Sequence, residues 1–145
     1  MNAESIDEVM EKYLHERMEK GKEEAIQRFL AYAYLKHGKD GVLEFLLKTG
    51  GLARHYIKHL RCMEKSIRWP ETAWFAIMAA VGVYGYALMG MEDSYILGII
   101  LVAGTLVHAV SLFHMIVRKM REIDLRIVLY HEIIQIVENE LRSMV

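Results

Sequence analysis

Two long apolar stretches dominate the pattern of the sequence. Residues 72–91 and residues 94–117 contain no Asp, Glu, Lys or Arg, whereas charged residues are dense on either side. The hydrocarbon core of a bilayer is about 30 Å thick and requires roughly 20 apolar residues in helical form. Both stretches reach that length, so the pattern predicts two membrane-spanning helices. The short connection at residues 91–94 makes them antiparallel neighbours in a hairpin that occupies residues 70–117.

Charges around this hairpin predict its orientation. Basic residues flank it on both sides: Arg61, Lys65 and Arg68 precede it, and Arg118, Lys119 and Arg121 follow it. The connection instead carries Glu92 and Asp93. Because Lys and Arg are enriched on the cytoplasmic side of membrane helices, we expect both termini in the cytoplasm and residues 91–94 on the opposite side. The alternative is a pair of core helices in a soluble bundle, but the remaining segments are too short and polar to cover them.

Residues 1–69 have an amphipathic helical pattern, and glycines and a proline interrupt it. Helices are expected up to Gly21, over residues 22–37, over residues 40–48 before Gly50 and Gly51, and over residues 52–69 before Pro70. No segment alternates between apolar and polar residues as a strand does. The predicted fold is therefore all-α, with a cytoplasmic region of four short helices ahead of the hairpin.

The last part of the chain, residues 118–145, repeats apolar residues at spacings of three and four. No Gly or Pro follows Gly104, so one helix is expected to run from Tyr95 to Arg142. The repeat comprises Met120, Ile123, Ile127, Tyr130, Ile134, Val137 and Leu141. These positions form either a coiled-coil seam between copies of the chain or a face that packs on the chain's own first helices. Further apolar residues at Leu129, Ile133 and Ile136 favour a broad contact of the second kind.

Composition adds few constraints. The chain has 145 residues, of which 54% are hydrophobic, and a formal net charge of −1. Its one cysteine, Cys62, rules out an internal disulfide. Residues 36–68 carry eight Lys or Arg against three Asp or Glu, a charge that anionic lipid headgroups explain better than nucleic acid. No nucleophile, zinc-protease or phosphate-binding motif is present, so the sequence does not indicate an enzyme.

Four residues of the hairpin are candidates for an ion path. Glu92 and Asp93 would form a ring of carboxylates at the outer mouth of a symmetric oligomer, and such rings attract cations. His108 lies near the middle of the second span, and Ser111 follows it on the same face. The competing interpretation is a solvated loop, together with a neutral His108 that hydrogen-bonds across a pair of helices.

His55 and His59 lie one helical turn apart, and two imidazoles at that spacing can share a metal ion. Cys62 follows on the same face but about 10.5 Å from residue 55 along the axis, so His131 or a second copy would have to complete the site. A metal or haem is therefore the alternative to the expectation that the protein has no cofactor. The alternative is a solvated basic face beside the membrane.

Three functions follow from these patterns. The first is a non-catalytic membrane anchor, scaffold or assembly subunit, which forms homo-oligomers and docks a cytoplasmic protein partner through its helices. The second is a small homo-oligomeric cation channel that uses Glu92, Asp93, His108 and Ser111. The third is a metal- or haem-binding membrane protein that uses His55 and His59.

Overall fold

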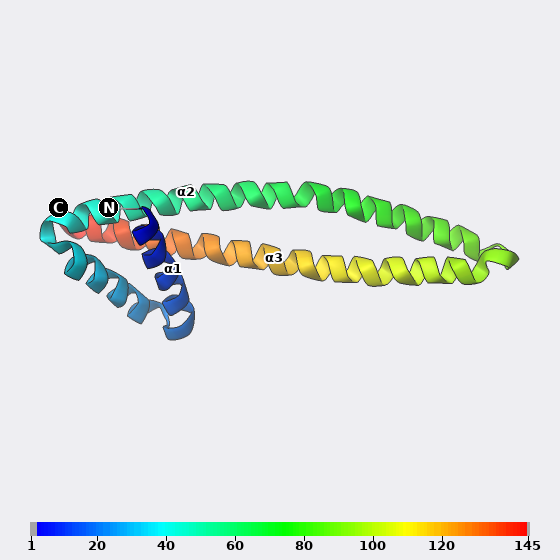
Figure 1. The fold of residues 1–145 in the computed structure, drawn as a ribbon, viewed down its shortest axis with the longest axis horizontal. Helices are drawn as coiled ribbons and strands as arrows, with labels where there is room; N and C mark the ends of the chain where they lie inside the picture. The colour runs from blue at the N-terminus through cyan, green and yellow to red at the C-terminus, as the bar shows by residue number, and fades with distance from the viewer. Residues whose placement is uncertain (1–2, 145) are drawn as a thin grey trace. The chain divides into compact units, whose positions relative to one another are not determined.

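The computed structural model describes residues 3–144, apart from the side chains of residues 3–5, 68 and 69, and every element in this range is helical (Figure 1). The elements are α1 (Ala3–Lys20), α2 (Lys22–Met89), the 3-10 turn η1 (Glu92–Ser94) and α3 (Tyr95–Met144). The all-α prediction is confirmed. So is the uninterrupted helix from Tyr95 to Arg142, because α3 contains that whole range.

The predicted breaks within residues 22–69 are correct at one glycine and wrong at the others. Gly38 has φ +64° and ψ −176°, which kinks α2. The helix nevertheless continues through Gly50 and Gly51. Gly50 is buried, and a β-carbon added to it would lie 3.3 Å from Cγ1 of Val137. This glycine therefore permits two helices to approach closely and does not end a helix.

The break predicted before Pro70 is also wrong, because α2 passes through this residue. Proline has no N–H to donate and disfavours helical geometry in the residue before it, at a cost of about 3 kcal/mol inside a helix. The helix includes the residues on both sides of Pro70, and neither residues 52–69 nor residues 71–81 contain a glycine.

Residues 1–60 and 124–145 form one compact unit with its own hydrophobic core. The largest fully buried side chains in the core come from all three long helices: Met10, Tyr13, Val42, Phe45, Leu46 and Ile133. Phe29 packs between two of these side chains: the centre of its ring lies 5.7 Å from the centre of the Tyr13 ring and 6.1 Å from that of the Phe45 ring. Tight interdigitation of this kind fixes how the helices of the unit pack.

Residues of the predicted C-terminal seam contribute to the same core. Tyr130 and Val137 are buried in it, and Ile127, Ile134 and Leu141 pack against it. The stripe thus packs on helices of its own chain, as the additional apolar positions favour. Association between copies along this helix remains a prediction.

Residues 61–123 form the second unit, a hairpin of α2 and α3 joined by η1. Two glycines set the distance between its arms: a β-carbon added to Gly98 would lie 2.6 Å from the carbonyl oxygen of Gly85. Thr105 lies on the same packed face, and its hydroxyl lies 2.9 Å from the carbonyl oxygens of both Leu101 and Val102. The arms pack closely where Gly85 meets Gly98, and the Thr105 hydroxyl is hydrogen-bonded within its own helix.

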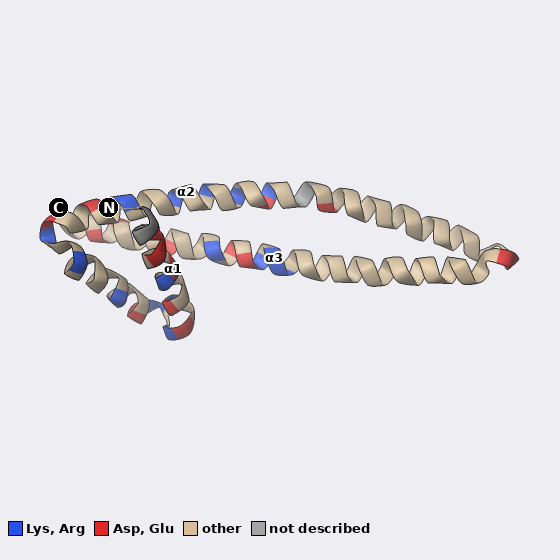
Figure 2. Cartoon of the chain, in the orientation of Figure 1, with Lys and Arg blue, Asp and Glu red and all other residues tan. Residues whose placement is uncertain are grey.

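The outer surface of the hairpin is apolar. Large hydrophobic side chains are exposed along both arms, among them Ile77, Val83, Tyr84, Ile96, Ile100, Leu106, Val107, Val110 and Phe113. Figure 2 shows long uncharged stretches on both arms and acidic residues at the tip. The structure thus contains two helices long and apolar enough to cross a membrane.

Candidate functional site

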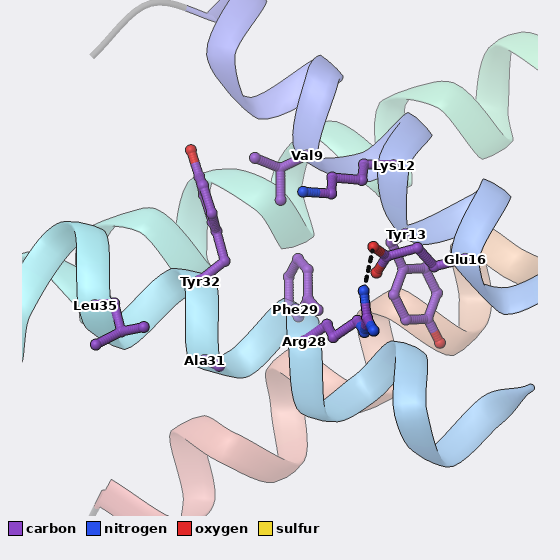
Figure 3. Close-up of a pocket in the computed structure, with 9 residues that line it drawn as sticks. All are labelled: Val9, Lys12, Tyr13, Glu16, Arg28, Phe29, Ala31, Tyr32 and Leu35. Atoms are coloured by element: carbon purple, nitrogen blue, oxygen red, sulfur yellow. Dashed lines mark hydrogen bonds and ion pairs between the residues drawn. The ribbon is translucent and has the colours of Figure 1, made fainter. Parts of the chain in front are cut away.

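A cleft of about 310 Å³ lies between α1 and the first part of α2 (Figure 3). The residues that line it are Val9, Lys12, Tyr13 and Glu16 from α1, and Arg28, Phe29, Ala31, Tyr32 and Leu35 from α2. Each set spans eight residues at helical spacing, so the cleft is about 10 Å long. Two amphipathic helices that pair antiparallel around Gly21 leave such a groove where their adjoining faces meet.

The floor of the cleft is apolar and its charges lie at the rim. Val9, Tyr13 and Phe29 are buried, whereas Leu35 is 87% exposed and extends the apolar surface outward. Arg28 is held by two carboxylates, at 3.5 Å from Glu16 and 2.7 Å from Glu24.

Lys12 differs from Arg28 at this rim. Its ammonium has no carboxylate partner in the part of the chain that the structure describes. Figure 3 shows its side chain pointing across the mouth of the cleft. The cleft therefore combines an apolar floor with one ammonium group that has no ion-pair partner among the described residues.

A buried polar cluster lies behind the cleft. Glu132 of α3 is 9% exposed and forms ion pairs with Arg17 at 3.2 Å and with Lys22 at 3.4 Å. Burial, together with the negative charge of Glu132, raises the pKa of Tyr13 to about 12. In Figure 3 the Tyr13 hydroxyl points away from the cleft. This cluster ties the turn between α1 and α2 to the C-terminal helix.

Sequence reasoning missed both the cleft and the cluster. Lys12 and Glu16 lie within the apolar periodicity of α1, and Glu132 lies between the core positions Leu129 and Ile133. Charged residues that interrupt an apolar stripe are the signal that points to such a cluster, because a buried charge requires a partner. The partners themselves come from other helices and cannot be read from local spacing.

The two histidines proposed as metal ligands lie on the surface of the same unit. His55 is exposed beside the ring of Tyr56. His59 lines a second cleft, of about 320 Å³, with Asp7, Met10, Glu11, Tyr56, Leu60, Arg126 and Tyr130. The Tyr56 hydroxyl donates to Asp7 at 2.7 Å, and Arg126 lies 3.5 Å from Glu11.

No group of three or more His, Cys, Asp or Glu within the described residues is arranged to hold a metal ion. His131, the residue suggested to complete such a site, has Nδ1 2.9 Å from the carbonyl oxygen of Ile127, one turn earlier on its own helix. The structure thus gives His55 and His59 no third ligand within the described chain.

Glu92 and Asp93 lie in η1, at the tip of the hairpin, and both are exposed. His108 and Ser111 are exposed on α3, outside the packed interior of the hairpin. The His108 ring meets the Trp74 ring edge-on at a centroid distance of 6.4 Å. Neither His108 nor Ser111 has a hydrogen-bond partner among the described residues.

The remaining positions of the predicted seam divide between the two units. Ile123 is buried and Met120 is half-buried in the hairpin unit, whereas the later positions belong to the helical core described above.

Comparisons of the chain with protein families, with curated proteins and with solved structures find no match.

Proposed function

We propose that this protein is a non-catalytic membrane anchor that assembles with further copies of itself. The hairpin of residues 61–123 inserts into a bilayer and retains the helical unit of residues 1–60 and 124–145 at the membrane surface. The observation that carries the proposal is the apolar outer surface of the hairpin, which water would solvate poorly and lipid would cover.

The proposed orientation rests on the charges at the ends of the hairpin. Antiparallel arms place residues 61–68 and 118–121 on the same side, and both segments are basic, while Glu92 and Asp93 are at the tip. The basic side is the cytoplasmic one by the bias of Lys and Arg. Both termini then lie in the cytoplasm.

Cysteine labelling in sealed cells tests insertion and orientation together. Cys62 is exposed and lies at the basic end, so an impermeant maleimide should label it only after the cells are permeabilised. In a Cys62→Ser background, Asp93→Cys should be labelled in intact cells. The reverse pattern would invert the orientation, and release of the protein by alkaline carbonate would exclude insertion.

Self-association is inferred from one face of α3. Gly104 is exposed, and a β-carbon added to it would meet no atom within 4 Å. His108 and Ser111 lie within about 40° of Gly104 around the helix and expose polar atoms where lipid would otherwise surround them. An imidazole and a hydroxyl each donate and accept, so two copies that share a membrane orientation can pair His108 with Ser111.

Disulfide trapping tests this face. In the Cys62→Ser background, Ser111→Cys should form an intermolecular disulfide on mild oxidation, whereas Val110→Cys, also exposed but on another face, should not. Adding His108→Leu should reduce the yield from Ser111→Cys. Equal yields at residues 110 and 111 would show random collision and exclude this interface.

A cation channel is the second candidate function, because the same face would place His108 and Ser111 along a central path in an assembly of three or more copies. Glu92 and Asp93 would then surround its outer mouth. Reconstituted vesicles should show cation flux that Glu92→Gln with Asp93→Asn reduces. Absence of flux from a verified oligomer, at acidic and neutral pH, would exclude the channel and leave the anchor.

A further inference from the structure

The cleft between α1 and α2 has the features of a ligand site that the anchoring function does not require. Its volume of about 310 Å³ lies at the lower end of the range for small-molecule sites, about 300 to 1,000 Å³. The lining extends along two turns of each helix, so the space is elongated. An extended chain of about eight carbons matches its length of about 10 Å.

The floor and the exposed end of the cleft specify an aliphatic ligand. Phe29 is 4% exposed and Val9 is 8% exposed, so only narrow apolar strips of these side chains remain uncovered at the base of the groove. Leu35 continues this surface outward from the end of the groove. Covering apolar surface gains about 0.8 kcal/mol for each buried methylene group.

The rim specifies the charge of the ligand. Arg28 is already paired with Glu16 and Glu24, which leaves Lys12 as the lining cation without an ion-pair partner among the described residues. Lys36 adds a further positive charge beyond the rim, with its ammonium 4.9 Å from the centre of the Tyr32 ring. A carboxylate or phosphate group would complement this end of the groove.

We propose that this cleft binds a single-chain anionic amphiphile, with an aliphatic chain of about eight carbons along the floor and a carboxylate or phosphate head beside Lys12. The inference does not depend on the membrane anchor, because the helical unit alone supplies all nine lining residues. A fatty acid and an alkyl phosphate share this chemistry and differ in the head group.

Binding of radiolabelled octanoate to the full-length protein in lipid nanodiscs tests the proposal, with empty nanodiscs as the blank. Saturable binding of one octanoate per chain is expected, and affinity should rise about fourfold for each methylene from hexanoate to octanoate. Octylammonium should bind at least about tenfold more weakly than octanoate, because it loses the attraction of Lys12 and is repelled by it. Octyl phosphate, measured in parallel, identifies the preferred head group.

Three variants locate the site. Lys12→Gln should weaken octanoate binding about fivefold, the order expected for one exposed ion pair. Ala31→Trp, at an exposed position of the lining, should abolish binding by filling the groove while helicity stays unchanged. Lys20→Gln, a matched lysine of α1 outside the cleft, should bind as the wild type does. Equal uptake of octanoate and octylammonium by all variants would show partition into lipid and overturn the proposal.

Discussion

At the scale of single residues, Glu132 is the most informative side chain of the helical unit. Its carboxylate lies among core residues of α3, yet it is paired with Arg17 at the end of α1 and with Lys22 at the start of α2. One buried acid thereby connects three helices. A carboxylate in such a place is retained only with its partners, because an unpaired buried charge is costly.

Glu132→Gln should lower the free energy of unfolding by about 1 to 2 kcal/mol, since Arg17 and Lys22 are partly exposed and can turn to water. Thermal unfolding followed by circular dichroism in nanodiscs measures the loss. Glu19→Gln is the control, because Glu19 is exposed and pairs with the exposed His15. Equal losses in the two variants would contradict a connecting role for Glu132.

Individual residues also show how far the sequence alone could go. Tyr130 and Val137 were recognisable as part of an apolar stripe, but whether the stripe packs within the chain or between chains depends on helices far away in sequence. Lys12 could not be distinguished from other surface lysines, because its cleft exists only after α1 and α2 pair. The spacing of apolar residues thus identifies the apolar face of a helix, but only the packed structure shows which other helix contacts that face.

At the scale of elements, the glycines of α2 have different roles although they look alike in sequence. Gly38 adopts a positive φ and kinks the helix, whereas Gly51 is helical, exposed and without neighbours in contact range of an added β-carbon. Glycine predicts a helix end only where the backbone adopts that left-handed geometry. The sequence does not reveal which glycine does so, which explains the error at residues 50 and 51.

A matched pair of substitutions in α2 tests this distinction. Gly38→Ala should destabilise the protein by about 1 to 3 kcal/mol, because φ +64° with ψ −176° is a backbone geometry that essentially only glycine adopts. Gly51→Ala should stabilise it by about 0.5 to 1 kcal/mol, because alanine restricts the unfolded chain and its methyl group meets open space. Both are measured as thermal unfolding midpoints. A stabilising Gly38→Ala would show that the kink is not needed.

A second pair belongs to the hairpin. Gly98→Ala should destabilise its packing by about 1 to 3 kcal/mol, since the methyl group would lie 2.6 Å from the Gly85 carbonyl oxygen. Gly104→Ala, on the same helix but in open space, should leave the hairpin stable. Resistance of the hairpin to denaturation by increasing sodium dodecyl sulfate, read from helicity, distinguishes them. Similar midpoints for both variants would mean that the arms do not pack at Gly98.

At the scale of the whole molecule, three buried or half-buried tyrosines couple stability to alkaline pH. The pKa of Tyr13 is raised to about 12, chiefly by burial, and that of Tyr56 to about 12, chiefly by its hydrogen bond to Asp7. Burial, with the charge of Glu11, raises the pKa of Tyr130 as well. All three phenols are therefore more acidic in the unfolded chain than in the folded one.

This difference stabilises the fold fully below pH 10, the ordinary pKa of tyrosine, and the stabilisation is lost as pH rises from 10 through about 12. Helicity at a fixed temperature near the unfolding midpoint should fall across that range. Tyr13→Phe should make the fall shallower, whereas Tyr95→Phe, at the tip of the hairpin, should not alter it. If helicity decreased equally in Tyr13→Phe and in the wild type, the loss of stability could not be assigned to ionisation of Tyr13.

The order of the chain has a consequence for its synthesis. The core of the helical unit joins residues from the first sixty positions to residues after position 124, and the hairpin separates them in sequence. A ribosome must therefore deliver the entire hairpin before Ile133 is available to close that core. Until then, the apolar surfaces of the N-terminal helices that contact the end of α3 remain exposed. A chain whose synthesis stops within α3 should therefore be a preferred substrate for chaperones and proteases.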